Sequence, residues 1–198
     1  MRREQSIAPE YFEALYADHG DPWSFETSPY EAAKYTETLA ALPGPRFGHV
    51  LEVGCANGVL TERLGPRCDT LLAVDVSPTA LAAARTRCAA QPNIRFEQRR
   101  LPEEAPAGPF DLVLLSEVVY YWDSADIVRL AGYLRSAVVP AGHVMLVHWI
   151  GETDYPKSGD DAVAELRAAL GDGLTVVRSD RYEAYRLDLW RIDPVERD

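Results

Sequence analysis

Apolar and polar positions along the chain follow two periods, one typical of strands and one typical of helices. Five stretches, most of them almost continuously apolar, predict buried strands of a parallel sheet: VLEV (50–53), TLLAVDV (70–76), IRFEQ (94–98), the start of FDLVLLSEVVY (110–120) and HVMLVHWI (143–150). Four stretches between and after them predict helices: VLTERLGP (59–66), PTALAAARTRCAA (78–90), DSADIVRLAGYLRSAVV (123–139) and DDAVAELRAAL (160–170). Strands alternating with helices indicate an α/β fold with a mostly parallel sheet.

Both ends of the chain depart from this alternation. The segment from Pro9 to about His19 predicts a helix, HGDPW (19–23) interrupts it, and a second helix is expected from Pro29 to about Leu42. Near the other end, LTVVRSDRYEAYRLDLWRI (174–192) predicts two antiparallel strands with a turn near Asp180. We therefore expect an N-terminal helical extension over 1–45, an α/β domain over 46–192 and a polar tail over 193–198.

Ligand-binding loops are expected at the carboxyl ends of the parallel strands. These are the loops after Val53, Asp75, Gln98, Ser116 and His148. The first of them contains Gly54, Ala56 and Gly58, small residues that let a ligand approach the backbone. This turn alone is a weak signal, and Val59 stands where a dinucleotide fingerprint needs its third glycine, which argues against a nicotinamide-dependent reductase. Asp75, at the end of the next strand, can accept hydrogen bonds from both hydroxyls of a ribose.

Four pieces in this order and spacing carry a family resemblance: LEVGCANG, LLAVDVSPTAL, FDLVLLSEVVYY and PAGHVMLV. Together they cover about Phe47 to Trp149 and resemble the class I methyltransferases that use S-adenosylmethionine (SAM). The preceding YFEALYADHGDPWSFETSPYEAAKYTETL resembles the front of the nodulation protein S family, which N-methylates an amino sugar. The resemblance implies a Rossmann-like sheet of seven strands, mostly parallel with an antiparallel C-terminal edge strand, and SAM as the cofactor with S-adenosylhomocysteine (SAH) as its product.

The resemblance also implies roles for particular residues. Those expected to bind the cofactor are Trp23, Lys34, Glu52, Gly54, Ala56, Gly58, Asp75, Val76, Leu101 and Ser116. Lys34 would pair with the methionine carboxylate. Arg100 stands where an acid usually accepts from the adenine amino group, so backbone groups near Leu101 or the side chain of Glu103 would have to serve.

The acceptor side is expected to be lined by residues that follow the fourth and fifth strands. Glu117, Tyr120 and His148 are the candidate catalytic residues, with Glu117 binding an ammonium and His148 or water taking its proton. Further candidates for substrate contact are Tyr121, Trp122, Asp154, Tyr155 and Asp160.

Composition narrows the class of protein. A net charge of −11, from 31 acidic and 20 basic residues, makes a nucleic-acid substrate an unlikely partner and suits a cationic one. No apolar run reaches the length of a membrane span, and MRREQSIAPE lacks the apolar stretch of a signal peptide. Three cysteines without a CxxC motif suggest neither a disulfide framework nor a metal site, and a reducing cytoplasm fits best.

The expected activity is SAM-dependent methylation of an amine on a small molecule, such as an amino sugar or a natural-product intermediate. Two alternatives stay open: methylation of a hydroxyl on a small metabolite, and a protein of this fold that only binds its ligand. The acceptor, the number of methyl groups transferred and the oligomeric state are not specified by the sequence.

Overall fold

The computed structural model describes residues 2–193, which form two compact units. The α1–β3 unit comprises Ala8–Arg100. Its elements are α1 (Pro9–Asp18), α2 (Pro29–Ala40), β1 (Phe47–Val53), α3 (Val59–Leu64), the 3₁₀ turn η1 (Gly65–Arg67), β2 (Cys68–Asp75), α4 (Pro78–Arg87) and β3 (Ile94–Gln98). The β4–β7 unit comprises the chain up to Ile7 and from Leu101 onward. Its elements are β4 (Phe110–Ser116), the 3₁₀ turn η2 (Val119–Tyr121), α5 (Ser124–Ala137), β5 (Val138–Trp149), α6 (Gly159–Leu170), β6 (Leu174–Arg181) and β7 (Tyr185–Ile192).

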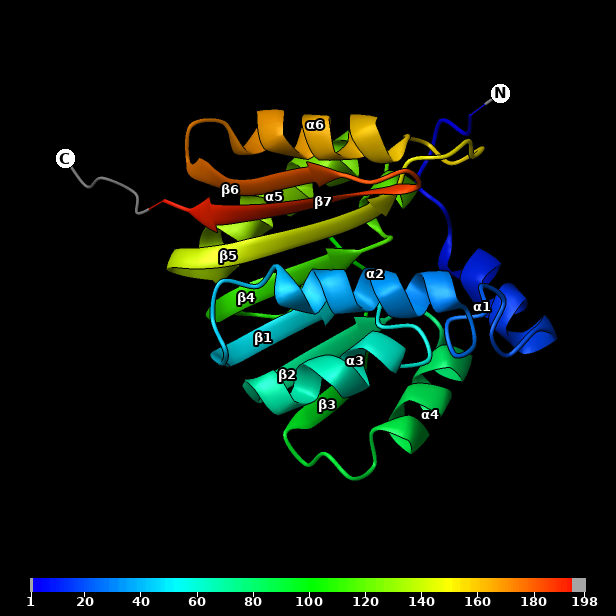
Figure 1. Ribbon diagram of the computed structural model, residues 1–198. Helices are drawn as coiled ribbons and strands as arrows, with labels where there is room; N and C mark the ends of the chain where they lie inside the picture. The colour runs from blue at the N-terminus through cyan, green and yellow to red at the C-terminus, as the bar shows by residue number, and fades with distance from the viewer. Residues whose placement is uncertain (1, 194–198) are drawn as a thin grey trace. The chain divides into compact units, whose positions relative to one another are not determined.

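The seven strands form a mixed sheet, which confirms the predicted fold class. In the α1–β3 unit the order is β3-β2-β1 and every pairing is parallel. In the β4–β7 unit the order is β4-β5-β7-β6, and β7 runs antiparallel to both of its neighbours (Figure 1). The strand that runs against the others is therefore β7, and the edge strand β6 runs in the same direction as β4 and β5.

Local sequence explains where most helices begin. Ser28, Ser77, Asp123 and Ser158 precede α2, α4, α5 and α6, and each side chain accepts a hydrogen bond from the backbone N–H three residues later. Pro29 and Pro78 follow two of these caps at the first helical position, where a missing N–H costs nothing.

Strand register brings the ends of neighbouring strands level with one another. Val53 of β1 is paired with Val74 of β2, and Asp75 is paired with Gln98 of β3. In the other unit, Ser116 of β4 is paired with Val147 of β5, so the residues that follow them also lie side by side. Leu114, Leu115, Leu146 and Val147 are fully buried, which makes this end of the sheet a rigid support.

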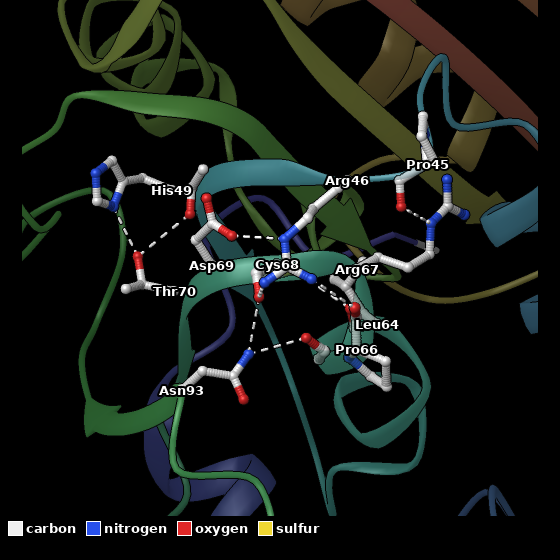
Figure 2. Close-up of polar contacts among 12 residues, drawn as sticks. Pro45, Arg46, His49, Leu64, Pro66, Arg67, Cys68, Asp69, Thr70 and Asn93 are labelled. Atoms are coloured by element: carbon white, nitrogen blue, oxygen red, sulfur yellow. Dashed lines mark hydrogen bonds and ion pairs between the residues drawn. The ribbon is translucent and has the colours of Figure 1, made fainter.

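Two arginines form hydrogen bonds at the end of the α1–β3 unit where β1 and β2 begin. Arg46 pairs with Asp69 at 2.6 Å and reaches the carbonyl of Pro66, and Arg67 donates to the carbonyl of Pro45 (Figure 2). Arg67 also donates to the carbonyls of Leu39 and Gly44. Nearby, Asn93 donates to the carbonyls of Gly65 and Cys68. These contacts fasten the segment after α2 to the turn that precedes β2.

Two predicted boundaries need correction. The helix expected over 123–139 ends at Ala137, and Val138 already begins β5. The turn expected near Asp180 lies at 182–184, because β6 continues to Arg181. The compact units also divide the predicted extension at Ile7, and they place no division at residue 45. Of the predicted tail, residues 194–198 lie outside the described part of the chain.

Candidate functional site

The loop after β1 has a left-handed backbone at three positions. Gly54, Ala56 and Gly58 have φ of 75°, 51° and 82°. A Cβ on Gly58 would lie 3.0 Å from the Cα of Ala84 in α4, so this position accepts only glycine without a shift of the helix. The three residues predicted from their small size thus form a tight turn at the end of β1.

Four N–H groups of this loop donate to acceptors inside the unit. Gly54 and Cys55 donate to the carbonyl of Val74 at 2.8 and 3.1 Å, and Gly58 donates to the carbonyl of Cys55 at 2.9 Å. Ala56 donates to Oδ2 of Asp75 at 2.9 Å. A phosphate-binding loop needs such donors turned toward its ligand. The geometry therefore weighs against a dinucleotide cofactor and suits a cofactor that has no phosphate.

Asp75 is the acid that fastens this loop to the next one. Its Oδ1 accepts from the N–H of Ser77 at 2.9 Å, and its Oδ2 accepts from the N–H of Ala56 at 2.9 Å. Burial raises the pKa of this carboxyl, and the hydrogen bonds from Ser77, Ala56 and Val76 oppose the rise. Val76 is half-buried, and its carbonyl accepts from Nε2 of Gln98 at 3.1 Å. Asp75 ends β2 and Val76 follows it, and their ribose and adenine contacts stay predictions.

The side chain of Glu52 is buried within β1. Its pKa is raised to about 8 because burial disfavours the carboxylate. The side chain of Thr61 lies next to Glu52 and partly opposes this rise, and Glu52 Oε2 and Asn57 Oδ1 are buried polar atoms without a hydrogen-bond partner among residues 2–193. Such atoms are normally satisfied by protein, by ordered water or by a ligand. They mark a polar interior beneath the glycine loop.

Two predicted cofactor residues come from the extension. Trp23 is half-buried, and its ring packs against those of Tyr16 and Phe25, with 5.6 Å between centroids in each case. Lys34 is buried in α2, and its Nζ lies 2.9 Å from Oε1 of Glu31. The predicted partner of Lys34 was the methionine carboxylate of the cofactor, whereas the structure gives it a carboxylate on its own helix.

Sequence analysis missed Glu13, which docks α1 beside Asp75. Its carboxylate accepts from Ser77 Oγ and Thr79 Oγ1, each at 2.5 Å, and from the N–H of Thr79 at 3.3 Å. These hydrogen bonds lower the pKa of Glu13. Ser77 and Thr79 lie at the start of α4, where a negative charge is favourable. Spacing alone could not reveal this contact, because 64 positions separate Glu13 from Ser77.

In the β4–β7 unit, Glu117 is held at the end of β4 by neighbours on β5 and η2. It has a left-handed backbone, with φ of 57°, and its N–H donates to the carbonyl of Val147 at 2.8 Å. Its Oε2 accepts from the hydroxyl of Tyr120 at 2.6 Å and from the N–H of Trp149 at 2.8 Å. The preceding Ser116 is half-buried at the end of β4. A carboxylate fixed in this way is prepared to meet a cation.

Three tyrosine rings gather next to this carboxylate and are called the tyrosine cluster below. The ring centroids of Tyr120 and Tyr121 lie 4.7 Å apart, those of Tyr121 and Tyr155 also 4.7 Å, and those of Tyr120 and Tyr155 5.4 Å. Burial and the charge of Glu117 raise the pKa of Tyr120 well above its usual range. Tyr120 therefore keeps its proton at neutral pH and acts as a hydrogen-bond donor. Trp122, the next aromatic residue, is half-buried.

The surroundings of His148 do not support the predicted role of a base. Its side chain is fully buried in β5, and its Nε2 accepts from the N–H of Val119 at 3.1 Å. An imidazole nitrogen that accepts this bond carries no proton and has its lone pair engaged. We therefore correct the expectation: His148 holds the η2 turn in place.

The remaining candidates have structural partners. Asp160 pairs with Arg181 at 2.6 Å and Arg186 at 2.9 Å, which lowers its pKa, and Asp154 pairs with Arg3 at 3.2 Å. Leu101 is buried, whereas Arg100 is exposed and Glu103 lies 3.7 Å from Arg129. Among residues 2–193, no group of three or more His, Cys, Asp or Glu side chains is arranged to hold a metal ion. No helix in the described chain has the length and apolarity needed to cross a membrane.

Comparison with known proteins places this arrangement in a family. The sequence profile of the nodulation protein S family matches residues 13–142. Nodulation protein S of Sinorhizobium fredii is 33% identical over 128 residues, which cover 63% of this chain and 59% of that protein. The chain thus spans little more than half the length of the curated relatives it matches.

Solved structures give the same result for the fold. A candidate methyltransferase from Pseudomonas syringae is 39% identical, with a TM-score of 0.71 over 82% of this chain and 98% of that one. The N-methyltransferase nodulation protein S from Bradyrhizobium japonicum, solved with SAH, is 22% identical, with a TM-score of 0.80 over 95% of this chain and all of that one.

Proposed function

The chain belongs to the nodulation protein S family, and from this premise we propose that it is a SAM-dependent methyltransferase acting on an amine of a small molecule. An amino sugar or a natural-product intermediate is the acceptor class that the resemblance favours. The observation that supports an amine acceptor is the fixed carboxylate of Glu117, which accepts hydrogen bonds from the Tyr120 hydroxyl and the Trp149 N–H.

The α1–β3 unit fits the cofactor half of this proposal. Its glycine loop leaves no bulky side chain at Gly54, Ala56 and Gly58, and the carboxylate oxygens of Asp75 can accept from ribose hydroxyls. Trp23 would cover the cofactor from within this unit, and the expected cofactor roles of Lys34, Leu101 and Ser116 stay predictions from the resemblance. SAM supplies a methyl group on a positively charged sulfur, which is already activated for in-line attack.

The chain's own residues would bind the acceptor and orient it. The carboxylate of Glu117 would hold the acceptor ammonium, and the Tyr120 hydroxyl would keep that carboxylate in place. The ammonium would give its proton to water, and bound SAM would supply the methyl group for the resulting amine and leave as SAH. Tyr120 donates a hydrogen bond throughout and gives up no proton.

A hydroxyl acceptor has less support. A hydroxyl is a weak nucleophile until a base removes its proton. The imidazole that could serve, His148, already accepts the N–H of Val119 through Nε2.

The test is mass spectrometry of paired acceptors after incubation with the protein and SAM. Each amino sugar is paired with the sugar that carries a hydroxyl at the same position. A gain of methyl groups on the amino members alone supports the proposal, and a gain on the hydroxyl members makes the protein an O-methyltransferase. Binding of SAH without methylation of either contradicts the acceptor class, and failure to bind SAH contradicts the activity.

Glu117→Gln tests the ammonium site itself. Because the amide has no negative charge, we expect kcat/KM for the amine to fall about 10–100-fold while SAH binds normally. Asp172→Asn, which neutralises an exposed acid in the turn before β6, is the control and should keep full activity. Full amine turnover by Glu117→Gln would rule out this role.

A further inference from the structure

Residues 2–7 belong to the β4–β7 unit and lie along the loop over 151–158 and the start of α5 (Figure 1). We call Arg2–Ile7 the strap. In contrast, the rest of the extension, from Ala8, belongs to the other compact unit. The strap is thus a separate feature of the extension, and the cofactor residues proposed above do not include it.

One end of the strap holds the loop after β5. The N–H of Arg3 donates to the carbonyl of Asp154 at 2.9 Å, and its Nε pairs with the Asp154 carboxylate at 3.2 Å. Arg2 donates through Nη1 to Thr153 Oγ1 and to the carbonyl of Tyr155, both at 3.2 Å. Two consecutive arginines therefore bind three consecutive loop residues.

The other end holds η2 and the start of α5. Ser6 Oγ accepts from the N–H of Asp123 at 2.9 Å and donates to the carboxylate of Asp126. The N–H of Ile7 donates to the carbonyl of Tyr121 at 2.9 Å. Asp123 is the cap of α5, so Ser6 fastens the strap to the most ordered part of this region.

The two ends hold the backbones of two rings in the tyrosine cluster. Arg2 bonds the carbonyl of Tyr155, and Ile7 bonds the carbonyl of Tyr121. Because the centroids of these two rings lie 4.7 Å apart, a movement of the loop would separate them. We propose that the strap sets the spacing of Tyr121 and Tyr155 and thereby determines which acceptors bind. The proposal rests on the proposed function only in taking the tyrosine cluster as part of the acceptor site.

The contacts of the strap are individually weak. The side chains of Arg3 and Asp154 are 44% and 60% exposed, and exposed ion pairs of this kind contribute little and are screened by salt. The strap therefore holds by the sum of its contacts, and removing several side chains together should release it without unfolding the sheet.

The experiment compares the triple variant Arg2→Ala, Arg3→Ala, Ser6→Ala with wild type. Hydrogen exchange of residues 151–158 should become roughly fivefold faster in the variant. With an acceptor that wild type methylates, KM for the acceptor should rise by a similar factor while kcat and the Kd of SAH stay unchanged. Arg191→Ala is the matched control, since Arg191 of β7 is 45% exposed, close to the 44% of Arg3, and it donates to Thr175 and pairs with Asp193.

A charge exchange separates positioning from general loss of structure. Arg3→Asp alone should raise the hydrogen-exchange rate of residues 151–158 and the KM for the acceptor. Arg3→Asp combined with Asp154→Arg should restore both quantities, because the ion pair forms again with its charges exchanged. Unchanged loop exchange in the triple variant would overturn the proposal, as would faster exchange with an unchanged acceptor KM. If wild type methylates no amine but loop exchange still rises, the proposed function fails while the strap's hold on the loop stands.

Discussion

Glu52 shows how a single buried acid can set the pH response of the protein. The carboxyl lies inside the α1–β3 unit, and burial raises its pKa from an ordinary 4.5 to about 8. At neutral pH the folded protein therefore holds a neutral carboxylic acid, while the unfolded chain holds a carboxylate. The sequence suggests this residue as a ligand contact, and the structure shows that its carboxyl is buried.

Stability should therefore fall as pH rises from about 4.5 to 8, because only the unfolded chain releases the Glu52 proton in this range. Glu52→Gln removes that titration and keeps the shape of the neutral acid. We expect the variant to match wild type near pH 4.5 and to be more stable by about 1–3 kcal/mol at pH 8. Urea unfolding at both pH values checks this, and parallel pH dependences for the two proteins would contradict it.

Asp75 is the residue on which cofactor affinity should depend most. Asp75→Asn replaces one acceptor oxygen by a donor, which conflicts with the N–H groups of Ala56 and Ser77 and weakens acceptance from a ribose. Calorimetry should show SAH binding about 10–100-fold weaker. Asp69→Asn, at the start of the same strand and paired only with exposed Arg46, should leave SAH affinity unchanged (Figure 2). Equal affinity in both variants would exclude Asp75 from the site.

At this scale, the sequence predicts positions better than partners. Asp75 and Glu117 follow from the rule that ligand-binding residues lie after parallel strands. The contacts of Lys34 with Glu31 and of His148 with Val119 do not follow from it, because they depend on which way a buried side chain turns. The sequence shows that a histidine ends a strand, but it does not show that the ring is already hydrogen-bonded.

Among the elements, α1 depends on one side chain for its place. Glu13 accepts from Ser77 and Thr79 at the start of α4, and its lowered pKa means that the carboxylate is stabilised in the folded protein. That stabilisation is present above the ordinary pKa of 4.5 and is lost as pH falls through the lower folded value.

Glu13→Gln should therefore cost about 1 kcal/mol at pH 7, the usual contribution of a charge at a helix start. Amides of α1 should exchange faster in the variant, whereas Glu37→Gln on the exposed side of α2 should change neither quantity. The stability difference between Glu13→Gln and wild type should shrink toward pH 3, and a difference that is constant with pH would contradict the charge-based explanation.

Within residues 2–193, the pattern of apolar residues locates each α-helix and each strand, and most boundaries shift by a few residues. Val138 and Val139 are β-branched and precede Pro140, which disfavours helix at the residue before it, so the early start of β5 was available from local chemistry. The local sequence does not indicate the late turn between β6 and β7. Arg181 and Arg186 both pair with Asp160 of α6 and thereby keep the strands paired beyond Asp180, and this contact spans distant positions.

For the whole molecule, the excess of negative charge should matter during binding. A net charge of −11 attracts a cationic acceptor over distances that salt shortens. Raising ionic strength from about 20 mM to about 200 mM should lower kcat/KM for an ammonium acceptor several-fold, mainly through KM. An uncharged acceptor or an N-acetylated analogue should show no such dependence in a competition assay, and identical salt dependences would argue against long-range attraction.

The hydrogen bond between His148 and Val119 has a further consequence for how turnover responds to acidity. Since this hydrogen bond engages the imidazole lone pair, the proposed reaction would take no base from His148, and the basicity of the amine itself would decide the pH at which a nucleophile exists. In a series of amines with graded basicity, the rising limb of the pH–rate profile should move in step with the pKa of each amine. A limb that stays at one pH for all of them would instead reveal a titrating group of the protein.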